Sequence, residues 1–72
     1  MPESAPLVIK LNGVSRVCAS GTTLAAVVLE QAHDPLAIAT AVNGAFVARH
    51  LRHRHRLNNG DVVLFFAPMV GG

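Results

Sequence analysis

The sequence predicts an α+β fold in which one helix packs across a mixed sheet of four or five strands. Two Asn-Gly pairs, at positions 12–13 and 43–44, stand between short apolar segments and are typical of tight hairpin turns. A segment with helical spacing, 24–31, lies between them, and a strand-like apolar run, 62–67, follows near the end. A helix laid across the sheet is the simplest way to bury both apolar faces.

The first hairpin begins with the segment Leu7–Leu11, in which every second residue is apolar. Its return strand is predicted over Val14–Ala19. A two-residue turn assigns Val14, Arg16 and Cys18 to the inward face of that strand. Arg16 interrupts the apolar pattern, so we expect it at the rim of the sheet with its head in water. Cys18 is expected in the core as a small apolar residue.

The helix is predicted from its cap and its spacing. Thr22 and Thr23 precede it, and either hydroxyl can cap it. The helix should end before Pro35, because the residue before a proline avoids the helical region. The apolar side chains expected to pack on the sheet are Leu24, Val27 and Val28.

A second hairpin and a last strand complete the sheet. Segments 38–42 and 45–48 flank the second Asn-Gly turn, and turn residues 58–61 lead to a strand that begins at Val62. The apolar run that starts there fits a central strand. The first and last strands are therefore expected to pair in parallel at the centre of the sheet.

The last strand also carries candidate partner contacts. Alternation separates Val63 and Phe65, which should face the helix, from Leu64 and Phe66 on the open face. Exposed apolar side chains grouped in this way mark protein interfaces. We therefore predict that Leu64 and Phe66 bind a partner.

The tail after this strand is predicted to bind as an extended segment. Met69 and Val70 would supply side-chain contacts beside main-chain hydrogen bonds. Gly71 and Gly72 lack side chains, so a carboxylate there could pass through a narrow channel of another protein.

Composition limits the classes of function. The 72 residues are 51% hydrophobic and 14% charged, which predicts one small domain whose apolar surface is partly covered by a partner. We expect a leader over 1–6, a folded body over 7–66 and an exposed tail over 67–72. The single cysteine excludes an internal disulfide framework. With neither a signal peptide nor a membrane span expected, the predicted location is cytoplasmic.

Five short motifs occur in a specific order. They are Asn12-Gly13, Gly21-Thr22-Thr23-Leu24, Ala41-Val42-Asn43-Gly44, Asn59-Gly60-Asp61 and Ala67-Pro68-Met69-Val70-Gly71-Gly72. In this order the chain resembles, over residues 7–72, the ubiquitin-like β-grasp sulfur carriers, and most closely the ThiS-type carriers of thiamine thiazole synthesis. It departs from that family at Ala48, where proline is frequent, and in the strongly basic run Arg49–Arg56.

The resemblance implies a carrier cycle. An ATP-dependent adenylating (activating) enzyme would adenylate the carboxylate of Gly72. Sulfur from a persulfide donor of the cysteine desulfurase type would displace AMP, leave a thiocarboxylate, and pass to a thiazole synthase. Gly71, which has no side chain, would let the tail enter the narrow channel of a partner. The carrier would be no enzyme and would bind no cofactor, and no Ser/His/Asp or Cys/His motif contradicts this.

The run Arg49–Arg56 leaves alternatives open. It holds four of the six Lys/Arg residues and three of the four histidines. The run could be a solvated connection or a docking surface for an acidic partner. Nucleic acid is disfavoured, because the run has no aromatic residue to stack on bases. His53 and His55 alone do not make a metal site. Besides the thiazole carrier, the candidates are a carrier for another product, as in the small subunit of molybdopterin synthase, a ubiquitin-like modifier, and an RNA-binding β-grasp module.

Overall fold

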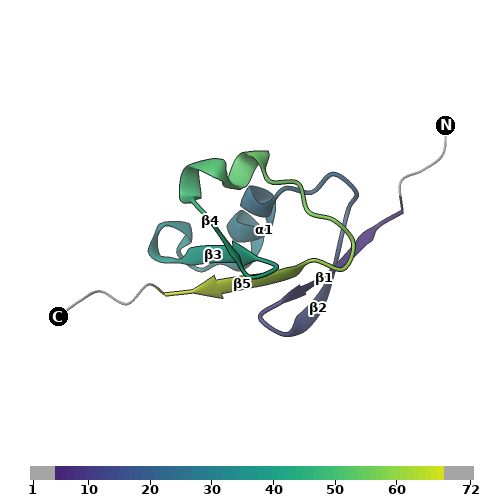
Figure 1. Cartoon of the computed structure of the whole chain (residues 1–72), viewed down its shortest axis with the longest axis horizontal. Helices are drawn as coiled ribbons and strands as arrows, with labels where there is room; N and C mark the ends of the chain where they lie inside the picture. The colour runs from purple at the N-terminus through teal and green to yellow at the C-terminus, as the bar shows by residue number, and fades with distance from the viewer. Residues whose placement is uncertain (1–4, 68–72) are drawn as a thin grey trace.

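A five-stranded mixed sheet with one α-helix packed across it forms the fold (Figure 1). The computed structural model describes residues 5–67. The elements follow in the order β1 (Leu7–Leu11), β2 (Val14–Cys18), α1 (Leu24–Gln31), the 3-10 helix η1 (Pro35–Ala37), β3 (Ala39–Val42), β4 (Ala45–Val47), the 3-10 helix η2 (Arg49–Arg54) and β5 (Val62–Phe66). Within this range no helix is long and apolar enough to cross a membrane.

The last strand lies at the centre of the sheet, as predicted. The strand order is β2-β1-β5-β3-β4. β5 pairs in parallel with β1 and antiparallel with β3, and both outer pairs are antiparallel hairpins. The chain therefore leaves the sheet from its middle strand.

Both Asn-Gly pairs form the turns that the sequence predicted. Asn12 and Gly13 have φ values of 49° and 83°, and Asn43 and Gly44 have values of 53° and 83°. Two successive residues in this left-handed region make the turn type whose twist matches that of the flanking strands. Glycine enters this region without strain and asparagine tolerates it.

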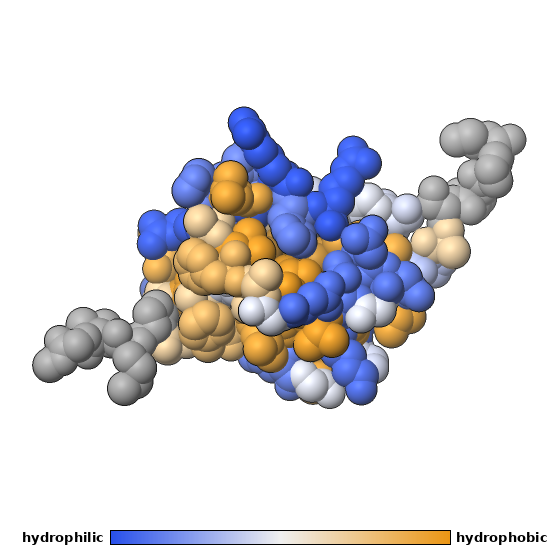
Figure 2. Space-filling view, in the orientation of Figure 1, coloured by the Kyte–Doolittle hydropathy of each residue, from blue (hydrophilic) through white to orange (hydrophobic). Residues whose placement is uncertain are grey.

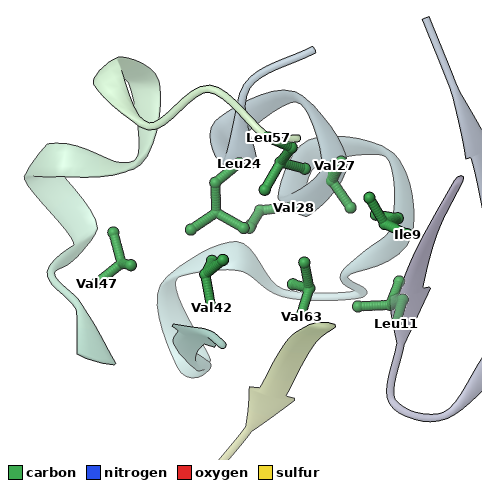
Figure 3. Close-up of a cluster of buried hydrophobic side chains, with 9 residues drawn as sticks. All are labelled: Ile9, Leu11, Leu24, Val27, Val28, Val42, Val47, Leu57 and Val63. Atoms are coloured by element: carbon green, nitrogen blue, oxygen red, sulfur yellow. The ribbon is translucent and has the colours of Figure 1, made fainter. Parts of the chain in front are cut away.

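The core lies between α1 and the sheet. The predicted helix face is confirmed, since Leu24, Val27 and Val28 are buried, and Thr23 caps the helix by accepting from the Ala26 backbone N at 3.2 Å. In Figure 3 side chains from the helix and from the chain after η2 face side chains from the strands across this layer. The cluster comprises Ile9, Leu11, Leu24, Val27, Val28, Val42, Val47, Leu57 and Val63.

The inward face predicted for β2 is mostly exposed, which corrects that expectation. Val14 is 54% exposed and Arg16 is also exposed, whereas Cys18 is half-buried against the core. β2 is an edge strand, and the buried cluster that α1 covers stops at β1. The rim position predicted for Arg16 fits this arrangement.

The basic run is not simply a solvated connection, which is a second correction. Its first six residues form η2, and Arg52 within it is only 5% exposed. The chain after η2 is held to the start of α1, because Leu24 N donates to the His55 carbonyl at 2.8 Å and Leu57 N donates to the Thr22 carbonyl at 3.0 Å. The run is therefore ordered against the body.

Candidate docking site at the end of the central strand

The two faces of β5 differ as the alternation predicted. Val63 is fully buried, and Phe65 is partly buried against the core. Leu64 and Phe66 point to the other face and remain 42% and 45% exposed. The positions predicted for both candidate partner contacts are confirmed, and their binding role stays a prediction.

An apolar row crosses the open face of the sheet beside these residues. Leu64 pairs with Ala41 on β3, and Ala41 pairs with Phe46 on β4. Because paired residues share a face of the sheet, Phe46, which is 68% exposed, lies on the same face as Leu64 and across β3 from it. Val62 extends the apolar surface along the strand. The site is therefore wider than the two predicted residues.

A groove adjoins the last residue of β5. It has a volume of about 360 Å³ and is lined by Phe46, Phe66, Leu36, Ile38, Ala39, Ala48, Arg49 and Arg52. Figure 2 shows hydrophobic side chains gathered near the end of β5 and hydrophilic ones projecting over η2. A mainly aliphatic and aromatic groove with a cationic border suits protein contact rather than catalysis.

Asn12 extends the pairing of β5 beyond the end of β1. The parallel ladder stops at Leu11 and Val63, where Asn12 N donates to the Val63 carbonyl at 3.0 Å. The Asn12 side-chain Oδ1 then accepts from the Phe65 backbone N at 2.9 Å. A strand-like hydrogen bond is thus made by a side chain, and it holds β5 at Phe65 to the turn of the first hairpin.

The asparagine of the second hairpin holds the beginning of the same strand. Asn43 Oδ1 accepts from Val62 N at 2.9 Å, and its Nδ2 donates to the buried carboxylate of Asp61 at 2.9 Å. The other Asp61 oxygen accepts from Asn58 N at 2.8 Å. Both turn asparagines therefore position β5, in addition to forming their own hairpins.

Arg52 ties η2 to the sheet. Its Nε donates to the Thr40 hydroxyl at 3.1 Å, and its two terminal nitrogens donate to the carbonyls of Pro35 at 3.1 Å and Ile38 at 2.7 Å. The Thr40 hydroxyl itself donates to the Val47 carbonyl at 2.9 Å. Burial, and next the nearby charge of Arg49, lower the pKa of the Arg52 guanidinium. The acceptors orient this cation but do not neutralise it.

The tail residues predicted to act, Met69, Val70, Gly71 and Gly72, lie outside the described residues. Among residues 5–67 no group of three potential metal-ligating side chains comes together. The sequence analysis missed Asn12 and Phe46 as parts of the site. Phe46 could have been found from the strand register, because the second turn sets that register. Asn12 could not, because its hydrogen bond with Phe65 joins residues 53 positions apart.

Comparison with known proteins agrees with this geometry. The model of the ThiS family matches residues 9–72. A crystal structure of the thiamine biosynthesis protein ThiS from Geobacter metallireducens superposes with a TM-score of 0.77. It is 21% identical and covers 92% of this chain and 100% of its own, so it shows the shared β-grasp fold. No curated protein matches the sequence significantly. The family match spans most of the chain, which therefore belongs to the ThiS family, the small sulfur carriers of thiamine biosynthesis.

Proposed function

We propose that the chain carries sulfur as a thiocarboxylate on Gly72 and donates it to a thiazole synthase. The main support is that the family match reaches residue 72 and so includes both terminal glycines. The geometry adds a central strand that leads toward them beside an exposed apolar face. This match also favours the thiamine pathway over the molybdopterin carrier.

The chemistry requires activation, because a carboxylate is a poor electrophile. An ATP-dependent activating enzyme would join the Gly72 carboxylate to AMP and release pyrophosphate. A persulfide sulfur would then attack the acyl carbon and break its bond to AMP. Reduction of the resulting acyl disulfide by a thiol would release the thiocarboxylate. The carrier contributes its fold, its tail and its docking face, and the partners contribute the catalytic groups.

The proposed docking face is the open side of the sheet around Leu64, Phe66 and Phe46. Leu64 and Phe66 belong to the strand from which the tail continues, Phe46 lies across β3 from it, and all three keep much of their surface exposed. Met69 and Val70 would extend the contact into the partner's channel. The activating enzyme and the thiazole synthase would bind this face in turn, since both must reach Gly72.

The test is the intact mass of the protein after incubation with its host's cell extract, ATP and cysteine. We expect a gain equal to replacing one oxygen by sulfur, located in the C-terminal peptide and absent without ATP. A chain lacking Gly72 should keep its fold and gain no mass. Normal loading of that truncated chain would overturn the proposal.

A further inference from the structure

A second groove lies on the helix side of the sheet and adjoins the first groove, with which it shares Leu36, Arg49 and Arg52. It has a volume of about 160 Å³ and is formed by α1, η1 and η2. Its floor includes Ala25, Leu29, Pro35 and Leu36, and Arg49 and His53 stand at its border. Leu29 and Leu36 are 75% and 68% exposed. Aliphatic side chains this exposed, beside cations, are a feature that the proposed sulfur transfer does not explain.

The positive charge at this groove is not neutralised by the residues that hold it. Arg52, which also lines the groove, is almost fully buried, and its three hydrogen bonds end on uncharged oxygens. Arg49 lies close enough to disfavour the charge of Arg52. Two acids neighbour the lining in the sequence, Glu30 beside Leu29 and Asp34 beside Pro35, and neither accepts a hydrogen bond from Arg52. Asp34 caps η1 by accepting from Leu36 N at 3.1 Å. A carboxylate brought by a partner would offset the repulsion between the arginines.

The border of the groove is also rigid. Arg52 fastens η2 to Thr40 and Ile38. The chain just after η2 is bonded to the start of α1 through Leu24 N and the His55 carbonyl. Cations on a fixed element lose less conformational freedom on binding than cations on a mobile loop.

We propose that this groove binds an acidic, leucine-bearing segment of a partner protein. The aliphatic floor would take a branched apolar side chain, and the guanidinium of Arg49 would pair with a neighbouring carboxylate. The floor has no aromatic residue on which a base could stack, so it favours a peptide over single-stranded nucleic acid. Leu64 does not line this groove, but Leu36, Arg49 and Arg52 line both grooves, so a segment bound here would lie beside the proposed docking face.

The test uses a short fluorescein-labelled peptide of Glu, Ala and helically spaced Leu, titrated with the full chain at low and high salt. Binding should weaken with salt, and amide NMR shifts should concentrate at Ala25, Leu29 and His53, which line this groove and not the one beside Phe66. Reversing the border charge with Arg49→Glu should weaken binding by at least about tenfold. Leu29→Ser should weaken it as well.

The matched control is Arg16→Glu, which makes the same charge change as Arg49→Glu on the exposed edge strand β2 and should leave affinity unchanged. Equal weakening by Arg16→Glu would show only general attraction to a basic protein and overturn the proposal. Shifts confined to the open face, no binding at all, or tighter binding of a single-stranded oligonucleotide at the same amides would overturn it too. The mass assay reports sulfur loading separately: Leu29 lies outside the groove beside Phe66, so Leu29→Ser should load normally even though it weakens peptide binding.

Discussion

On the helix side of the sheet Ile9, Thr40 and Val63 are completely buried, whereas on the open side Val62, Leu64 and Phe66 keep 42–45% of their surface. Val62 to Phe66 are consecutive residues of one strand, so the contrast comes from alternation and not from composition. The buried side removes apolar surface from water and stabilises the fold. The open side leaves similar side chains available for a partner. One strand can therefore serve stability and recognition independently.

The largest effects are expected from substitutions on the two faces of the sheet, which should change different properties. Ile9→Ala should lower the free energy of unfolding by about 2–5 kcal/mol, because it leaves a cavity in the core. Leu64→Ser should lower it by less than about 1 kcal/mol but slow sulfur loading by at least about tenfold through lost docking. Urea unfolding and the mass assay measure the two quantities.

Val14→Ser is the control for this pair, since Val14 is similarly exposed but lies on the helix side of the edge strand. It should leave loading unchanged. Loading slowed equally by Val14→Ser and Leu64→Ser would remove the distinction between the faces.

The next effect concerns the attachment of η2 to the buried face. Arg52→Met removes three hydrogen bonds and leaves the Pro35 and Ile38 carbonyls without this donor. We expect a loss of about 1–3 kcal/mol in unfolding free energy. The exposed Arg54 is the matched site, and Arg54→Met should change stability by no more than about 0.5 kcal/mol. Equal losses of unfolding free energy at both positions would mean that the buried hydrogen bonds of Arg52 do not stabilise the fold.

A smaller effect should appear where β5 leaves the sheet. Asn12→Gly keeps the left-handed turn but removes the acceptor of the Phe65 N–H, so the exchange of that amide with solvent should quicken by about tenfold. Hydrogen exchange followed by NMR measures it residue by residue. Asn43→Gly should instead quicken the exchange of the Val62 amide. Unchanged exchange of Phe65 in Asn12→Gly would show that this side chain does not hold the strand.

The smallest effect concerns the reactivity of Cys18, which lies on the helix side of the edge strand β2. Burial, and next the charge of Glu30, raise the pKa of the Cys18 thiol. Less thiolate is then present at neutral pH, so alkylation by iodoacetamide should be slower than for a free cysteine and should accelerate as the pH rises through the raised pKa. Glu30→Gln should lower that pKa and speed alkylation modestly. Alkylation as fast as free cysteine at neutral pH would contradict this.

Much of the fold could be predicted because its signals are local. The Asn-Gly pairs specified both turns, and the alternation in 62–66 correctly divided Val63 from Leu64. The prediction that the inward face of β2 is buried was wrong for Val14. Alternation tells which side a residue faces but not whether anything covers that side. Coverage depends on how far α1 and the core extend, which no local pattern records.

The sequence by itself determined the elements, the central place of the last strand, the family and the exposed positions of Leu64 and Phe66, since turn chemistry and periodicity are properties of neighbouring residues. The tertiary structure alone decided which arginine of the basic run would be buried. Four arginines occur within 49–56, and only Arg52 meets Thr40, which lies 12 residues away. It also decided that Asn12 would hold Phe65. Such contacts arise only when the folded backbone brings distant donors and acceptors within hydrogen-bond distance.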